Sequence, residues 1–78
     1  MTLEIISPHD ILFKGEAVSV SLPGQLGRFM VLKNHAPLIS VLTEGVVVCQ
    51  TPEGDEKSFE IKGGLADVEN NIISVCIY

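Results

Sequence analysis

Short stretches in which apolar and polar residues alternate recur along this chain. The most regular one runs from Ala17 to Leu22, where Val18, Val20 and Leu22 are expected to share one face. Weaker alternation occurs over residues 3–5, 58–61 and 73–77. A period of two residues is that of a β-strand with one buried side. No window carries apolar residues at helical spacing between helix caps, so the pattern predicts strands and no helix longer than two turns.

Turn-forming residues separate these stretches and set the number of strands. They cluster at Ser7–Asp10, Pro23–Gly27, Asn34–Pro37, Thr43–Gly45, Thr51–Glu56, Gly63–Gly64 and Asn70–Asn71. This spacing predicts an all-β fold, a small β-sandwich of roughly eight to ten short strands, in one domain over residues 1–78. The expected core is Leu3, Ile5, Val18, Val20, Leu22, Leu42, Phe59, Ile61, Val68, Ile73 and Val75.

The stretch from Pro23 to Leu38 concentrates turn residues around a short apolar segment. Pro23-Gly24 and Gly27 are expected to form one turn, and Asn34 to Pro37 a second. Between them lies a strand of about four residues, which spans roughly 13 Å. The next strand must begin at or after Pro37, because proline has no N–H for a sheet ladder. The polar residues of both turns are therefore expected to form one rim of the sandwich.

Composition adds an expectation about partners. Hydrophobic residues make up 46% of the 78 residues and the mean hydropathy is +0.39, more apolar surface than a small monomer hides easily. One exposed apolar face covered by a partner is therefore expected. The net charge of −5 argues against binding to nucleic acid or to an anionic membrane surface. With no membrane-spanning run and no signal peptide pattern, the sequence favours a cytosolic chain without direct membrane insertion.

Residues that could carry chemistry are few and scattered. Cys49 and Cys76 lack a second ligand at metal-binding spacing and are expected to be reduced and buried. His9 and Asp10 fit a solvated turn better than a catalytic pair. The carboxylates of Thr51–Glu56 lack the ligand order of a calcium loop, and no helix pattern follows Gly63-Gly64 to make a phosphate site. No catalytic residue, cofactor or metal is predicted.

Several groups of residues stand in the order and spacing of a known family: Leu22-Pro23-Gly24, Gly27, Phe29, Leu32, His35-Ala36-Pro37-Leu38, Gly45, Gly63-Gly64-Leu65 and Val68. Together they resemble the N-terminal domain of the epsilon subunit of the rotary F-type ATP synthase. The resemblance covers nearly the whole chain. It implies a non-catalytic rotor subunit of the central stalk, which packs on the gamma subunit and contacts the polar loops of the c ring, coupling proton flow to ATP synthesis.

The resemblance also implies a site and a location. It assigns the contact with the c ring to Gln25, Leu26, Arg28, Lys33, Asn34 and His35. His35 matches a histidine of the family, whereas Arg28 stands where the family often has an acidic residue. The implied location is the cytoplasmic face of the inner (cell) membrane, as a peripheral part of the synthase complex.

The resemblance further implies a two-helix hairpin after the sandwich, which can bind ATP or inhibit hydrolysis in that family and which these 78 residues do not include. We therefore expect no nucleotide binding by residues 1–78.

Two other functions fit the sequence less well. One is a generic small all-β interaction module. The other is a carrier domain modified on a lysine at a hairpin tip. Lys33 follows Val31-Leu32 and precedes Asn34-His35, which matches neither the biotin nor the lipoate pattern.

Overall fold

The computed structural model describes all residues from Met1 to Tyr78, and it consists of nine β-strands without a helix. This confirms the predicted all-β class and strand number. The structure therefore contains no helix that could cross a membrane. In chain order the strands are β1 (Thr2–Ile6), β2 (Ile11–Glu16), β3 (Ser19–Gly24), β4 (Gly27–Leu32), β5 (Leu38–Leu42), β6 (Gly45–Gln50), β7 (Glu56–Ile61), β8 (Gly64–Glu69) and β9 (Ile72–Ile77).

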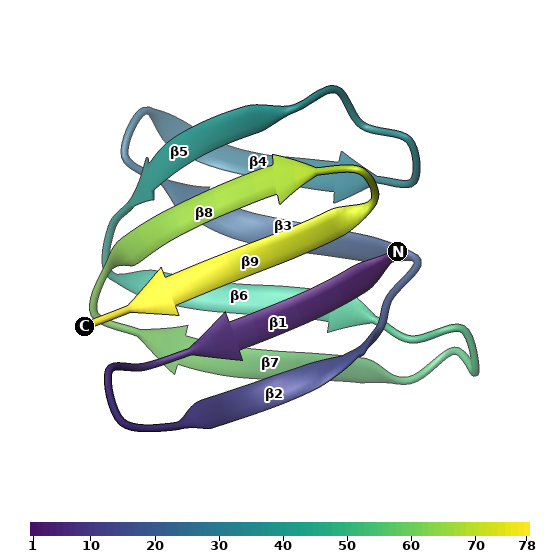
Figure 1. The fold of residues 1–78 in the computed structure, drawn as a ribbon, viewed down its shortest axis with the longest axis horizontal. Coiled ribbons are helices and arrows are strands. Elements are labelled where there is room, and N and C mark those ends of the chain that lie inside the picture. Colours follow the sequence, from purple (N-terminus) through teal and green to yellow (C-terminus); the bar gives the residue numbers. More distant parts are fainter.

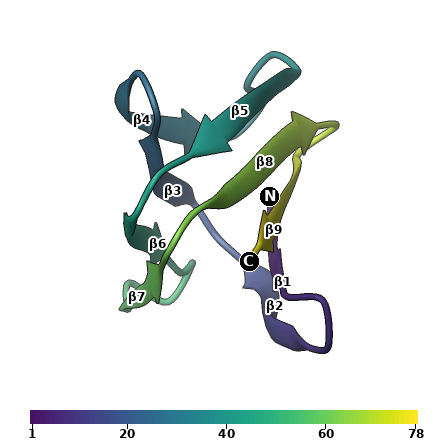
Figure 2. The ribbon, with the colours of Figure 1, turned by 90° about the vertical axis from the view of Figure 1, so that its left-hand side faces the viewer.

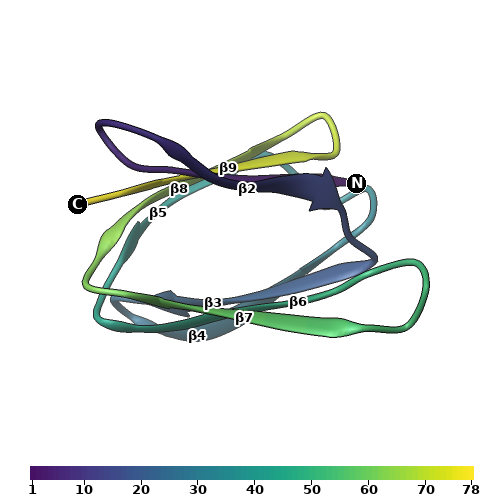
Figure 3. The ribbon, with the colours of Figure 1, turned by 90° about the horizontal axis from the view of Figure 1, so that it is seen from below.

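The strands form two layers that face each other (Figure 3). The order along the sheet is β2-β1-β9-β8-β5-β3-β6-β7, and β4 pairs with β3. One layer holds β2, β1, β9, β8 and β5, and the other holds β4, β3, β6 and β7 (Figures 1 and 3). β5 and β3 share only the pair Gly24 and Leu42, which marks where the sheet passes from one layer to the other.

The first and last strands lie side by side. β1 pairs with β9 in parallel, from Thr2 opposite Ile72 to Ile6 opposite Cys76. Every other pairing of strands is antiparallel. The two ends of the chain therefore lie at opposite ends of the same layer (Figure 1).

The core lies between the layers and contains most of the predicted residues. Nine of them are buried: Leu3, Ile5, Val20, Leu22, Leu42, Ile61, Val68, Ile73 and Val75. Phe59 is only partly buried and packs against the edge of the core. The prediction for Val18 is wrong, because its side chain is 48% exposed while that of Ala17 is 2% exposed.

The position of Val18 has a backbone cause. The amide of Ala17 donates to the carbonyl of Met1, which continues the ladder between β2 and β1, and Ala17 points inward. The amide of Val18 already donates to the carbonyl of Gln50, the last residue of β6, in the other layer. The chain therefore changes layer between the two residues, and the alternation read across them does not continue.

The turn after β3 differs from the prediction. Pro23 and Gly24 belong to β3, and the turn consists of Gln25 and Leu26. A side chain on Gly24 would begin 2.6 Å from the carbonyl oxygen of Gly27, so the close hairpin requires glycine there. Pro23 is tolerated because its missing N–H faces the gap where β3 passes from β6 to β5, and its carbonyl accepts a 2.9 Å hydrogen bond from Thr43.

Other turns agree with the sequence. Asn70 and Asn71 both have positive φ, 52° and 61°, as expected for a two-residue hairpin turn. Gly64 lies against the β9 backbone, where an added Cβ would clash with the carbonyl oxygen of Cys76. The turn predicted at Gly63-Gly64 thus leads into a close approach of the β8 and β9 backbones, which requires glycine at position 64.

Two features of the structure differ from the sequence-based predictions, namely the strand β2 and the exposure of Cys76. β2 was not foreseen, because its residues are exposed or only partly buried and show little apolar alternation. Cys49 is buried, but Cys76 is exposed on the outer side of β9, so its predicted burial is wrong. Neither cysteine forms a disulfide.

Candidate functional site

The first group of predicted site residues lies at the β3–β4 turn. Gln25 and Leu26 form the turn, and Leu26 is completely exposed. Arg28 follows at the start of β4 and directs its guanidinium Nη2 toward the carbonyl of Ser21, at 3.5 Å. Gly27 has a φ of 132°, which is a glycine conformation. The turn thus presents polar and apolar side chains to solvent on a tightly fixed backbone.

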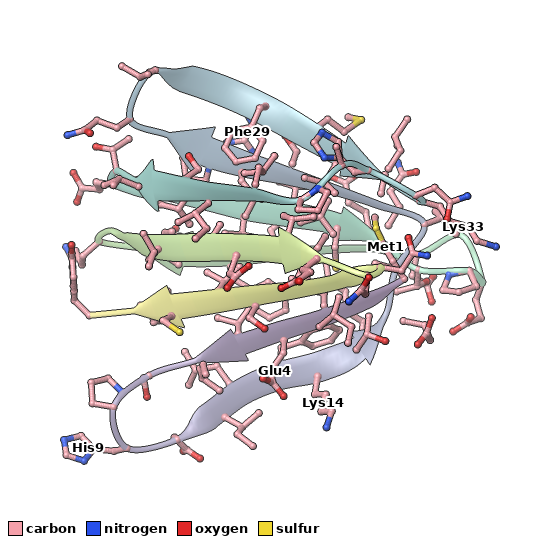
Figure 4. All side chains as sticks on the ribbon, turned by 45° about the horizontal axis from the view of Figure 1, so that its top comes forward. Met1, Glu4, His9, Lys14, Phe29 and Lys33 are labelled. Carbon is pink, nitrogen blue, oxygen red and sulfur yellow. The ribbon has the colours of Figure 1, made fainter.

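The second group lies in the loop after β4. Asn34 has a φ of 66°, and its amide donates to Asn71 Oδ1 at 2.6 Å. Asn71 Nδ2 donates in return to Asn34 Oδ1 at 3.0 Å. His35 Nδ1 lies 2.7 Å from the carbonyl oxygen of Ala36, and Lys33 extends away from the molecule (Figure 4). His35 is therefore hydrogen-bonded within its own loop, and Asn34 ties that loop to the β8–β9 turn.

The structure does not bring the two groups together at one end of the sandwich. They lie at opposite ends of β4, which has six residues where about four were predicted. At about 3.3 Å per residue the two groups are separated by about 20 Å. Gln25, Leu26 and Arg28 lie near the end where β5 terminates, and Lys33 lies at the other end (Figures 1 and 4). The six predicted residues thus lie along one edge strand, β4, and the turns at its two ends.

The charge of this region differs from that of the rest of the chain. No aspartate or glutamate occurs from Ala17 to Thr43, a stretch that contains Arg28 and Lys33. Neither of these two cations forms an ion pair with a carboxylate. By contrast, Lys14 lies 3.8 Å from Glu4, and Lys62 lies 3.5 Å from Glu44. The β4 edge is thus a locally positive surface on an acidic protein.

A second surface lies on the outer side of the five-stranded layer. The register aligns one residue from each strand into a continuous row, hereafter the outer row: Val41, Leu65, Cys76, Ile6 and Ile11. Val41 and Leu65 are 46% and 44% exposed, and Ile11 is more exposed still. The outer row crosses the end of the layer at which the C-terminus lies (Figure 1).

The neighbouring row on the same outer side is polar. It contains Asp67, Ser74, Glu4 and Lys14, beside one apolar residue, Ile39. Glu4 and Lys14 lie together there (Figure 4). The apolar surface is therefore a defined strip and does not cover the whole face. The outer row is not visible in the sequence, because it is continuous only through the pairing of β5 with β8 and of β1 with β9, strands that are distant along the chain.

The remaining candidate groups are dispersed. His9 projects from the β1–β2 turn (Figure 4), and the Asp10 carboxylate accepts a hydrogen bond from the amide of Ile11 at 3.0 Å. No three His, Cys, Asp or Glu side chains gather where they could hold a metal ion. Burial raises the pKa of the Cys49 thiol, an effect that the nearby Lys57 partly opposes.

Comparison with known proteins gives consistent matches along the chain. Residues 1–77 match the family model of the ATP synthase delta/epsilon chain, β-sandwich domain. The ATP synthase epsilon chain of a Nitratiruptor species is 39% identical over 71 residues, covering 91% of this chain and 55% of the relative. The epsilon chain of Chlorobaculum tepidum is 43% identical over 70 residues, covering 90% of this chain and 80% of the relative.

The fold also matches a solved structure. A chain in the cryo-EM structure of the Euglena gracilis mitochondrial ATP synthase, OSCP/F1/c-ring, superposes with a TM-score of 0.89 at 19% identity. The match covers 96% of this chain and 48% of that one. At this identity the likeness concerns the fold. The 78 residues thus span about half the length of the Nitratiruptor relative and of the Euglena chain.

Proposed function

Because this chain belongs to the delta/epsilon chain family of ATP synthase, as a β-sandwich domain of that family, we propose that it is an epsilon-type subunit of the central stalk. In this role it is a non-catalytic part of the rotor of a proton-translocating F-type ATP synthase. It packs on the gamma subunit, contacts the polar loops of the c ring and so couples proton flow to ATP synthesis. It resides in the complex at the cytoplasmic face of the membrane.

The outer row is the observation that carries this proposal. Apolar side chains from five strands form one strip, in which Ile6 is half-buried and the other four members are exposed in the isolated chain. Contiguous apolar surface bordered by polar residues is typical of an interface between proteins. We assign this strip to the contact with the gamma subunit. The assignment explains why the chain has more apolar residues than its two layers enclose.

We assign the ring contact to the two groups of predicted residues at the two ends of β4. Since the two groups of predicted residues are separated by about 20 Å along one strand, both can reach the ring only if β4 lies along it. A contact through Leu26 alone would instead place the sandwich with one end on the ring. Polar loops of the ring suit the exposed Gln25, Arg28 and Lys33 on this edge.

The test is assembly with a gamma subunit. Leu65→Glu and Val41→Glu each place a charge in the outer row, and Ser74→Glu places the same charge in the adjacent polar row as a matched control. We expect the two outer-row variants to lose co-purification with the gamma subunit and the control to keep it. The wild-type chain should also bind a hydrophobic dye that the gamma subunit displaces.

A different result would change the functional assignment. If all three variants co-purify with the gamma subunit equally well, the outer row is not the interface. If the wild-type chain itself does not co-purify with synthase subunits, the chain acts as a small interaction module for another partner.

A further inference from the structure

The outer edge of β4 carries backbone groups without partners. β4 pairs only with β3, in the register that sets Gly27 opposite Gly24 across the two-residue turn. Hydrogen-bonded and non-hydrogen-bonded pairs alternate in an antiparallel ladder. The alternation therefore directs the N–H and C=O of Arg28 and Met30 away from β3. Leu32 is the next residue whose backbone groups point away from β3. Its carbonyl accepts a hydrogen bond from the amide of His35, which lies outside the β3–β4 ladder.

The open edges of β2 and β7 are protected by charge, whereas those of β4 and of β5, which meets β3 at only one residue pair, are not. β2 and β7 form the lower borders of the two layers, and β4 lies at the upper border (Figure 2). β2 carries Lys14 and Glu16, and β7 carries three charged residues. Such charges normally prevent a second strand from pairing with an edge. β4 has one charge at its start, followed by the exposed apolar side chains of Met30 and Leu32.

Space for an added strand exists beside the first half of β4. An open groove of about 480 Å³ lies between this part of β4 and β5. Leu26, Arg28 and Phe29 line one side of it, and Ile39 and Val41 line the other. Apolar side chains in alternate positions of an extended segment would meet these residues, while its backbone faced the free groups of β4.

The charges at the two ends of β4 identify the kind of segment that fits. Arg28 and Lys33 have no carboxylate partner, and no acidic residue lies between Ala17 and Thr43. An acidic segment is therefore attracted to both ends. A second copy of this chain is disfavoured, because antiparallel pairing of two β4 edges would bring the Arg28 end of one copy to the Lys33 end of the other.

We infer that the outer edge of β4 is a strand-addition site for an extended, acidic segment of a partner protein. The segment pairs through its backbone with Arg28 and Met30 and places carboxylates near Arg28 and Lys33. This site combines the backbone of the strand with the side chains of Arg28 and Lys33, which the proposed ring contact also uses. It does not depend on the proposed function.

The probe is a synthetic peptide, acetyl-Glu-Ile-Thr-Ile-Thr-Glu-amide, titrated into the 78-residue chain labelled with ¹⁵N. We expect a dissociation constant on the order of 0.1 mM, with amide shifts centred on Arg28, Met30 and Leu32. The amides of Arg28 and Met30 should also exchange more slowly with solvent when the peptide is bound. Two control peptides isolate the cause: one has lysine in place of glutamate, and one is methylated at alternate backbone nitrogens.

Both control peptides should bind at least about tenfold more weakly, since one loses charge complementarity and the other loses backbone donors. Met30→Pro removes an outward N–H without removing a bond to β3, and Met30→Leu is its matched control. Arg28→Gln with Lys33→Gln removes the charges, and serves alone if the proline variant is unfolded. Each of the proline and charge variants should weaken binding, and Met30→Leu should not.

Three outcomes would overturn the inference. These are absence of binding at millimolar peptide, equal binding of the backbone-methylated peptide, and shifts centred on the outer row. Self-association of the free chain through β4, seen by sedimentation and lost in Met30→Pro, would replace the acidic partner with a second copy. A negative result in these experiments would not bear on the proposed contact with the gamma subunit. A negative result in the assembly test with the gamma subunit would not bear on strand addition at β4.

Discussion

The aromatic rings of Phe13 and Phe59 lie with their centroids 5.1 Å apart and join the two layers at the border formed by β2 and β7. These are the first and last strands in the order of the sheet, and no backbone pairing connects them. The Lys57 ammonium lies over the Phe13 ring, 5.3 Å from its centroid. Side chains thus close the border that the hydrogen-bonded ladder leaves open.

Removing either ring should destabilise the fold, and the two effects should be coupled. Phe13→Ala and Phe59→Ala should each lower the free energy of unfolding by about 2 kcal/mol, because both side chains are partly buried. A double-mutant cycle measured by urea unfolding should give a coupling of about 0.5 to 1.5 kcal/mol. Leu12→Ala, on the exposed part of β2, is the control and should change stability little.

Asn71 should stabilise the fold in two ways, by tolerating a positive φ and by its hydrogen bonds to Asn34. Asn71→Gly keeps the positive φ of 61° but loses both bonds to Asn34, so we expect a loss of about 1 kcal/mol. Asn71→Ala also strains the backbone and should lose about 2 kcal/mol. Asn70→Gly is the control, since Asn70 has a positive φ but no side-chain bond to this loop. Equal stability of Asn71→Gly and Asn70→Gly would show that the bonds to Asn34 contribute nothing.

Buried Cys49 should make the fold less stable in alkaline solution. Its pKa is raised above the ordinary value of 9.0, chiefly by burial. The unfolded chain therefore loses the thiol proton first as the pH rises, which favours unfolding. The contribution to stability is complete below about pH 9 and declines above it, toward the raised pKa of the folded state.

Urea unfolding between about pH 7 and pH 10.5 measures this decline. In Cys49→Val the decline above about pH 9 should be smaller than in wild type, whereas Cys76→Ser should behave like wild type because Cys76 is exposed. A thiol reagent at about pH 8 should modify Cys76 in the folded chain and Cys49 only after unfolding. Equal alkaline loss in Cys49→Val and wild type would contradict the assigned cause.

Crosslinking tests how β4 lies in an assembled synthase. In a Cys76→Ser background, single cysteines at Leu26 and at Lys33 should both crosslink to the c-subunit loop if β4 follows the ring. A cysteine at Glu53, in the β6–β7 turn, is the control and should not. If only the Leu26 position reacts, the sandwich meets the ring with one end. Crosslinks to the catalytic head alone would mean that the proposed orientation is wrong.

Much of the fold could be predicted because it depends on local patterns. Alternation located the core residues of β1, β3, β7 and β9, and turn residues located most hairpins. Prediction failed at Val18, where the chain changes layer, and at Pro23, which a strand accepts only because of where its missing N–H points. Both failures depend on which strand lies alongside, and a local pattern does not contain that information.

For the candidate surfaces too, features that depend on local sequence could be predicted and features that depend on strand pairing could not. Residues 25–35 could be proposed as a contact site because their turns are local, but the separation of the two turns depends on the length of β4. The outer row depends on pairings between residues as distant as Ile6 and Cys76, so it was not predicted. The open edge of β4 likewise became visible only when the order of strands was known.

The parallel pairing of β1 with β9 has a consequence for synthesis of the protein on the ribosome. β1 is made before the other strands of the sandwich, yet one of its two neighbours is β9, the last strand of the sandwich to be made. Until β9 leaves the exit tunnel, β1 has only β2 beside it, and an isolated pair of strands is at best marginally stable. The sandwich therefore cannot close progressively during translation. Leu3 and Ile5 remain without their final neighbours Ile73 and Val75 until all of the other strands of the sandwich have been made, so folding of the sandwich is completed late.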